Sequence, residues 1–243
     1  MEALDILLFI VLPYLALFIL IGGSMYRYRT NGFTVSSLSS EFLEGRKLFW
    51  GSQPFHWGLL FLFFGHLTAF LIPRSVLAWN SEPVRLIILE VTAFGFGLAV
   101  LFGLCALIYR RATNARIRTV TSKMDIFLLA LLLLQTITGL LIAYSERWGS
   151  SWFASVLTPY LWSIFSLSPD ISGLENTSWM IKIHIAGAFV LFLIIPFTRL
   201  IHLLVYPLPY IWRPYQVVRW YWDRKKIRDP QRATENNVPP QNN

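Results

Sequence analysis

Five long apolar blocks are the feature of this sequence that most restricts its fold. A helix needs about 20 apolar residues to cross the hydrocarbon core of a bilayer, which is about 30 Å thick. A soluble domain usually carries about 25% charged residues, whereas only 14% of these 243 residues are charged. We therefore expect an all-α membrane protein, a bundle of five transmembrane helices. The expected spans are residues 6–25, 49–72, 84–109, 125–144 and 179–205.

Basic residues between the blocks indicate how this bundle is oriented. Cytoplasmic loops of membrane proteins carry an excess of Lys and Arg. The connections after the first and third blocks are rich in these residues, whereas the other two hold only Arg74 and Arg147. We therefore expect the N-terminus outside and the C-terminus in the cytoplasm of a multi-pass protein of the cell (inner) membrane. The net charge of +8 then reflects membrane topology and not nucleic-acid binding.

The rest of the chain suggests no second domain. We expect residues 1–228 to form the membrane domain and the Pro- and Asn-rich residues 229–243 to form a disordered cytoplasmic tail. No basic residue precedes the first block, so we expect a membrane span there and not a cleaved signal peptide. Residues 152–167 are apolar but too short to span, which favours an interfacial helix or a cap over the outer end. The single cysteine, Cys105, excludes a disulfide framework or a cysteine-rich metal site within this chain.

Histidine is confined to the second and fifth spans. The four histidines are His56, His66, His184 and His202. Because the two spans run in opposite directions, His66 and His184 share the outer leaflet, and His56 and His202 share the inner one. A polar group inside a membrane is costly and requires a partner. Two pairs matched in depth are what two bis-histidine haems stacked between two helices require.

Helical spacing supports these pairs only in part. His184 and His202 are eighteen residues apart, which is five turns and roughly 27 Å, so a straight helix puts them on one face. His56 and His66 are roughly 15 Å apart and about 80° off one face. Tilt, or a kink at Pro196, would absorb the difference. Two alternatives stay open: core histidines bonded to backbone or hydroxyl groups, and a zinc or copper site, for which two histidines make a poor set.

Around these histidines the sequence resembles the gamma subunit of respiratory nitrate reductase, the membrane cytochrome b of that complex. The resemblance rests on Phe-His-Trp-Gly at 55–58, Gly65-His66, Ile183-His184 and the run Pro-Phe-Thr-Arg-Leu-Ile-His at 196–202. It implies two haem b groups, the distal one on the outer histidine pair and the proximal one on the inner pair. It also implies that quinol is oxidised near the outer haem and that electrons pass through the inner haem to an iron–sulfur subunit. A molybdenum catalytic subunit on the cytoplasmic side would receive them last.

Three residues are candidates for the quinol site and its proton exit. Glu90 lies about six residues into the third span, at the expected depth of His66, where a carboxylate could accept a proton from quinol. The alternative is that Glu90 only pairs with a cation such as Arg85 or Lys182, or faces a lipid headgroup. Arg85 stands where the resemblance suggests a lysine near the quinol pocket. Gly65, beside a ligand histidine, would let a flat macrocycle approach the backbone.

Other charged residues are candidates for binding the haem propionates, which need cationic partners near the membrane surface. The candidates are Arg199, Arg110 and Arg111 at the inner haem, and Arg74 and Lys182 at the outer haem. Snorkelling to lipid headgroups is the alternative for each.

Two further segments have simpler expectations. Asp125 opens the fourth span, where a carboxylate suits a helix N-terminus, so we expect it to cap that helix. Residues 206–228 are rich in Trp, Tyr and Arg, which predicts a docking surface for the electron-accepting subunit. An anionic-lipid patch is the competing interpretation of this segment.

Three other functions remain compatible with the residues. The same electron-transfer scaffold could serve a different partner oxidoreductase or run in the reverse, nitrite-oxidising direction. The chain could be a haem-binding membrane anchor without a quinol site. It could also be a transporter in which the histidines relay protons, and such a protein would show no Soret absorbance.

Overall fold

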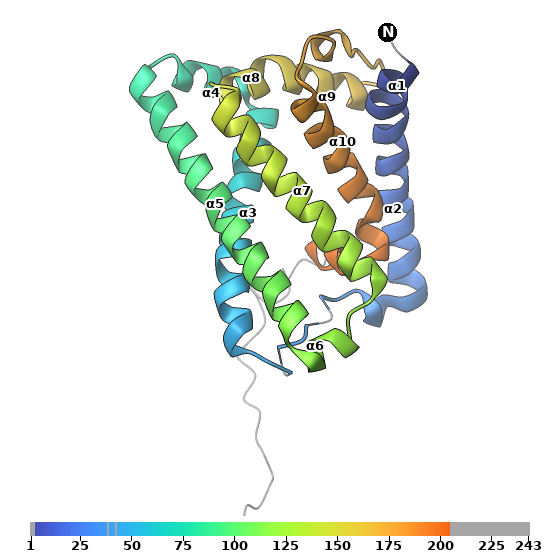
Figure 1. The fold of residues 1–243 in the computed structure, drawn as a ribbon. Coiled ribbons are helices and arrows are strands. Elements are labelled where there is room, and N and C mark those ends of the chain that lie inside the picture. Colours follow the sequence, from blue (N-terminus) through green and yellow to red (C-terminus); the bar gives the residue numbers. More distant parts are fainter. Residues whose placement is uncertain (1–2, 38, 42, 205–243) are drawn as a thin grey trace, which may run out of the picture. The chain divides into compact units, whose positions relative to one another are not determined.

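The computed structural model describes residues 3–37, 39–41 and 43–204, and every regular element in these ranges is a helix (Figure 1). The expected all-α fold with five membrane spans is confirmed, while the orientation of the termini stays a prediction. Five helical stretches are long and apolar enough to cross a membrane: Ala3–Asn31, Arg46–Leu71, Pro83–Thr113, Lys123–Ser145 and Trp179–Phe197.

Short helical turns extend or join these stretches. In chain order the elements are α1 (Ala3–Ile6), η1 (Leu7–Val11), α2 (Leu12–Asn31), η2 (Gly32–Thr34), α3 (Arg46–Leu71), α4 (Pro73–Asn80), α5 (Pro83–Thr113), α6 (Ala115–Thr119), α7 (Lys123–Ser145), α8 (Gly149–Trp152), η3 (Phe153–Leu157), α9 (Thr158–Phe165), η4 (Ser172–Leu174), α10 (Trp179–Ile194), η5 (Ile195–Phe197) and η6 (Arg199–Leu204).

The long helices pack in a fixed order. Helix α3 packs against α5, α5 against α7, α7 against α10, and α10 against α2. In this order α5 and α7 stand between the two histidine-bearing spans (Figure 1). The predicted docking segment at 206–228 and the predicted tail at 229–243 lie outside the described residues.

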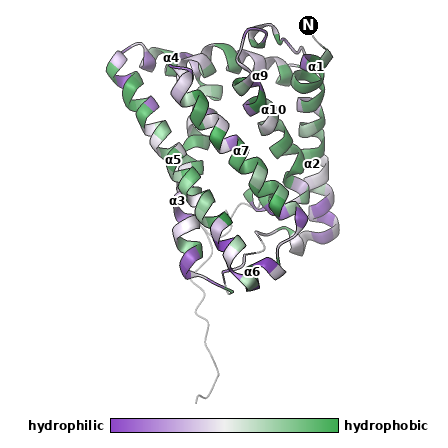
Figure 2. Ribbon diagram, viewed as in Figure 1, coloured by the Kyte–Doolittle hydropathy of each residue, from purple (hydrophilic) through white to green (hydrophobic). Residues whose placement is uncertain are grey.

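Many large apolar side chains on these helices are exposed. Hydrophobic residues run along the spans, and hydrophilic residues gather at the end that carries α6 (Figure 2). Within the described residues two buried clusters stand out: one joins the first span to α9 and α10 around Phe9 and Tyr160, and the other joins α3 to α5 around Phe55 and Leu104. An apolar surface of this extent fits contact with lipid tails.

Close backbone contact holds α3 against α5. A Cβ atom added at Gly103 would lie 2.6 Å from both the carbonyl oxygen of Gly51 and the amide nitrogen of Phe55. One added at Gly58 would lie 2.8 Å from the carbonyl oxygen of Phe96. Small residues allow helices to approach this closely in a membrane, where lipid tails remove the hydrophobic drive for association. Gly58 therefore serves helix packing, while the space around Gly65 is open within 4 Å.

The long outer connection forms a layer over one end of the bundle (Figure 1). Its apolar part is helical from α8 to α9, as expected for an interfacial cap. Thr158 Oγ1 donates to the carbonyl of Ala69 at 3.0 Å, and Tyr160 OH donates to that of Phe9 at 2.8 Å. Burial raises the pKa of the Tyr160 phenol above its usual value, which keeps it neutral as a donor. These bonds tie the cap to α3 and η1.

The fifth span differs from its prediction. Helix α10 ends at Ile194, the 3-10 turn η5 follows, and Thr198 is extended with φ −119° and ψ −179° before the 3-10 helix η6. The span predicted over 179–205 is therefore interrupted at Pro196, where a kink was one of the two expectations. The physical reason is Pro196, which lacks an N–H and whose ring clashes with the preceding turn. The argument that His184 and His202 share one helical face over five turns fails with it.

The glycine contacts between α3 and α5 predict a position-specific loss of stability. Gly103→Ala should lower the free energy of unfolding by about 1–3 kcal/mol, because the added methyl group overpacks the two backbones. Gly95→Ala is the matched control on the same helix, since an added Cβ there meets no atom within 4 Å. Thermal unfolding in detergent would measure both, and equal effects would contradict this account of α3–α5 packing.

Candidate functional site

The inner histidine pair is brought together across the bundle. His56 lies on α3 and His202 on η6, and their ring centres are 6.4 Å apart with the planes inclined by 59°. Two imidazoles bound to opposite faces of one metal ion, with metal–nitrogen bonds of about 2 Å, have ring centres roughly 6 Å apart. The spacing is too wide for stacked rings such as Phe61 and Phe96, at 4.1 Å. It therefore fits two imidazoles that share a metal ion.

Three of the four histidines direct Nδ1 at a carbonyl of their own chain segment. His56 Nδ1 lies 2.8 Å from the Ser52 carbonyl oxygen and His66 Nδ1 lies 2.7 Å from that of Leu62. His202 Nδ1 lies 2.5 Å from the carbonyl oxygen of Arg199. A carbonyl only accepts hydrogen bonds, so Nδ1 carries the proton in each neutral ring. The Nε2 lone pair is then free to bind a metal.

His184 reaches the same state through a neighbouring helix. Its Nδ1 lies 3.0 Å from Thr138 Oγ1 on α7. The Thr138 hydroxyl donates to the carbonyls of Leu134, at 2.9 Å, and Gln135, at 3.1 Å. Because that hydroxyl has one hydrogen, its oxygen accepts from His184, and Nε2 is again the free nitrogen.

Sequence reasoning missed Thr138 and Gln135 as partners of His184. Gln135 Nε2 donates to the His184 carbonyl oxygen at 2.8 Å. The signal for both was present, since polar side chains inside an apolar span require partners and these two lie three residues apart, on one helical face. Periodicity alone does not say which partner they bind.

The outer pair is closed on one side by the cap. His66 meets Phe153 of η3 edge-on, with ring centres 5.1 Å apart and planes at 87°. His184 lies on α10, in the other histidine-bearing span, and its pairing with His66 stays a prediction.

Charged residues at the inner end bind one another. Ser122 and Asp125 form a capping box, with Ser122 N donating to Asp125 Oδ2 at 2.9 Å and Asp125 N donating to Ser122 Oγ at 3.1 Å, so the expected capping role is confirmed. Asp125 also accepts from Arg199 Nη2 at 3.0 Å and lies 3.5 Å from Arg111 Nη1. Arg199 and Arg111 thus share a buried carboxylate, and their expected contact with propionates stays a prediction.

Arg27 binds the segment at which the fifth span is interrupted. Arg27 Nη1 on α2 donates to the carbonyl oxygens of Pro196, at 2.7 Å, and Thr198, at 3.2 Å. A helix break leaves carbonyls without helical partners, and these need donors when buried. Arg27 and the Asp125–Arg199 pair therefore position the segment that carries His202. Sequence reasoning had assigned Arg27 only to the basic loop.

The other predicted propionate partners lie elsewhere. Buried Arg110 donates from Nε to Glu44 Oε2 at 2.7 Å and from Nη1 to Ser40 Oγ at 3.0 Å, which fastens the loop before α3. The Lys47 main-chain N–H and, less strongly, Arg110 hold the pKa of Glu44 below its usual value. Lys182 Nζ lies 3.2 Å from Asp5 Oδ1. Arg74 is exposed on α4.

Glu90 belongs to a polar cluster under the cap. Ser150 of α8 donates to Glu90 Oε1 from its main-chain nitrogen at 2.9 Å and from its hydroxyl at 2.6 Å. Asn80 Nδ2 donates to the same hydroxyl at 3.0 Å, while buried Asn80 Oδ1 has no partner among the described residues. Of the two cations considered as alternative partners of Glu90, Lys182 pairs with Asp5 and Arg85 lies over the Trp79 ring at 5.3 Å.

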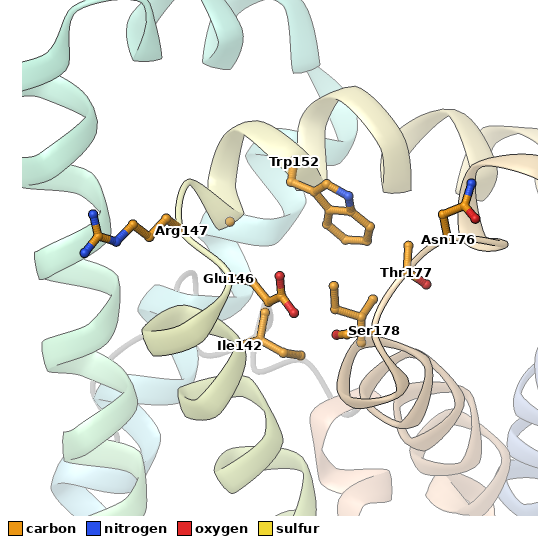
Figure 3. Close-up of a pocket in the computed structure, with 9 residues that line it drawn as sticks. Ile142, Glu146, Arg147, Trp152, Asn176, Thr177 and Ser178 are labelled. Carbon is orange, nitrogen blue, oxygen red and sulfur yellow. The ribbon is translucent and has the colours of Figure 1, made fainter.

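A pocket of about 150 Å³ opens at the outer ends of α7 and α10 (Figure 3). Glu146, Trp152 and Ser178 line it, and the Glu146 carboxylate points inward. Ile142 and Ile181 also line it, and each lies about one helical turn outward of Thr138 or His184. The pocket therefore borders the outer histidine.

The described residues contain no group of three or more His, Cys, Asp or Glu side chains that could hold a metal ion. A zinc site of the usual ligand number thus has no candidate within them. A pair of imidazoles such as His56 and His202 offers two ligands, a number that suits a metal whose other ligands come from a macrocycle.

Comparison with known proteins finds one family along most of the chain. The profile of the nitrate reductase gamma subunit matches residues 5–221. The nitrate reductase gamma chain of Bacillus subtilis is 37% identical, over 86% of this chain and 95% of the relative. The respiratory nitrate reductase 2 gamma chain of Escherichia coli is 30% identical, over 90% and 98%, and the respiratory nitrate reductase 1 gamma chain is 31% identical, over 90% and 99%.

The buried ion pair at the inner end predicts a charge-specific effect. Asp125→Asn keeps a side-chain oxygen that can accept from Ser122 N in the capping box but removes the negative charge beside Arg199 and Arg111. We expect a loss of about 3 kcal/mol in the free energy of unfolding, near the lower end for a broken buried ion pair. We also expect faster hydrogen exchange at residues 195–204, measured by mass spectrometry.

The control for that variant is Asp5→Asn, which breaks the more exposed Asp5–Lys182 pair. A surface ion pair contributes about 1 kcal/mol or less. Equal stability losses in the two variants, with unchanged exchange at residues 195–204, would refute the role given to Asp125.

Proposed function

Since the chain belongs to the nitrate reductase gamma subunit family, a membrane component of an oxidoreductase complex, we propose that it is the di-haem b subunit that oxidises quinol. Quinol is oxidised near the outer histidine pair. Electrons then move through the inner pair to an iron–sulfur subunit and a molybdenum catalytic subunit on the cytoplasmic side. The oxyanion chemistry takes place in a different chain.

The inner histidine pair is the observation that carries this proposal. His56 and His202 have ring centres 6.4 Å apart, and each has Nδ1 engaged by a carbonyl. Both therefore offer a neutral nitrogen lone pair across a gap of the width that one metal ion requires. Haem iron takes neutral imidazoles on both faces and, when bound, supplies a one-electron carrier.

The outer pair supports a second haem of the same kind. His66 and His184 both carry the Nδ1 proton, by bonds to the Leu62 carbonyl and the Thr138 hydroxyl. The space beside Gly65 is open, which leaves room for a flat group next to His66. The two histidines of α3 are roughly 15 Å apart along the helix. One continuous helix thus holds one ligand of each carrier.

The residues under the cap support quinol oxidation at the outer end. Oxidation of quinol releases two protons with two electrons, so it needs a proton acceptor close to the electron acceptor. The consecutive elements α8 and η3 contact both groups that this reaction needs. Ser150 of α8 bonds to Glu90, the proton acceptor, and Phe153 of η3 contacts His66, the ligand of the electron acceptor. Glu90 accepts the proton, Arg85 lies at the outer start of the same helix, and Gly65 leaves the approach to His66 open.

The inner end supports docking of the cytoplasmic partners. The arginines beside His202 and the basic loops at α6 lie at the end where the hydrophilic residues gather (Figure 2). By the positive-inside rule that end faces the cytoplasm of a cell inner membrane. Electrons leaving the inner pair therefore emerge on the side where iron–sulfur and molybdenum subunits would bind.

Selective loss of one haem tests the assignment of the four ligands. The purified protein should contain two b-type haems per chain by pyridine haemochrome assay. His66→Ala should remove the outer haem and His56→Ala the inner haem, which leaves one per chain in each case. Ser52→Ala is the control, since it removes only the hydroxyl that lies 3.1 Å from His56 Nδ1 and keeps the closer Ser52 carbonyl, at 2.8 Å, so both haems should remain. A colourless wild-type protein, or two haems retained in both histidine variants, would refute the assignment.

The proton-acceptor role of Glu90 predicts a rate effect. Glu90→Gln should slow quinol-dependent haem reduction by about 100-fold, as expected for loss of a general base, and should flatten its rise with pH. Chemical reduction by dithionite should stay normal. Glu175→Gln removes an exposed carboxylate of the outer connection and is the control. An unchanged rate and pH profile in Glu90→Gln would exclude the role.

A further inference from the structure

The four histidines differ in the kind of group that accepts the hydrogen bond from Nδ1–H. His56, His66 and His202 each use a main-chain carbonyl from within four residues. No substitution can remove such an acceptor, since every residue has one. His184 is the exception, because its acceptor is the side chain of Thr138 on another helix.

Burial and its own hydrogen bonds hold the Thr138 side chain in this position. The residue is buried, and its hydroxyl hydrogen is held by the carbonyls of Leu134 and Gln135 one turn earlier on α7. The oxygen lone pairs are thereby turned toward His184 Nδ1 at 3.0 Å. A hydroxyl group that donates its hydrogen is a better acceptor at its oxygen, because hydrogen bonds in a chain polarise one another.

The same face of α7 seats the rest of His184. Gln135 Nε2 donates to the His184 carbonyl oxygen at 2.8 Å. A Cβ atom added at Gly139 would lie 3.0 Å from His184 Cε1, so the imidazole edge rests against the α7 backbone. Residues three and four apart share one helical face. Gln135, Thr138 and Gly139 therefore form a seat for one side chain.

We propose that Thr138 is a positioning residue that sets the tautomer of His184 and lowers the midpoint potential of the outer haem. The inference rests on the proposed function and deepens it. An acceptor on Nδ1–H raises the basicity of Nε2, and a more basic axial ligand favours ferric over ferrous iron. The potential of the outer haem thus depends on one replaceable side chain, whereas the matching bond at the inner haem comes from the backbone.

The test compares two threonines of α7 in the complete membrane complex. Thr138→Val keeps the side-chain shape and removes the acceptor. Its outer haem should titrate at a higher midpoint potential than that of the wild type, with the inner haem unchanged. Thr138→Ser should stay close to the wild type. Thr136→Val is the control, since the Thr136 hydroxyl donates to the Leu132 carbonyl of its own helix, at 2.8 Å, and bonds to no histidine among the described residues.

The readouts are redox titration of the visible spectrum and electron paramagnetic resonance of the two ferric haems. An unmoved outer potential in Thr138→Val overturns the proposal, and so does an equal shift of both haems. Loss of the outer haem alone supports it if Thr138→Ser keeps that haem, and overturns it if Thr138→Ser loses it too. A wild-type complex without two haems refutes the proposed function itself, which separates the two failures.

Discussion

The hydrogen bond at Nδ1 of each histidine is the interaction on which the site depends. An imidazole in the apolar middle of a membrane needs a partner for each ring nitrogen, and a neutral ring has one donor and one acceptor. Carbonyl or hydroxyl oxygens accept a hydrogen bond from Nδ1 in all four rings, so Nε2 is the nitrogen that remains available to bind a metal. The helices need only bring two such rings close together, and at His56 and His202 the ring centres are 6.4 Å apart.

The helices themselves could be predicted because bilayer thickness fixes their length and lipid fixes their composition. The pairing of histidines by depth followed from spacing and loop charge, and the structure brings His56 beside His202. Hydropathy could not locate the end of α10, since apolar residues such as Leu200 and Ile201 continue past Pro196. Whether a proline kinks or ends a helix depends on donors from elsewhere, and here the donor is Arg27 on another helix.

The partners of the charged residues were the least predictable part of the site. A cation near the membrane surface has lipid, propionate and carboxylate within reach, and sequence does not rank them. Arg110 binds Glu44, and Arg199 binds Asp125, through contacts between residues far apart in the chain. Thr138 and Gln135 escaped notice for a related reason: their spacing marks a polar face, but only tertiary packing shows that His184 lies opposite.

The extended residue Thr198 is a point at which the fifth span can bend. Membrane helices change tilt when the hydrocarbon layer thickens or thins. His184 is tied to α10 and to Thr138 in the middle of α7, while Arg27 ties the segment of His202 to α2 and Asp125 ties it to the first turn of α7. Such tilting would bend the chain at Thr198 and leave the spacing within each histidine pair intact. Changes in lipid composition would then alter the separation between the two pairs before they disturb either one.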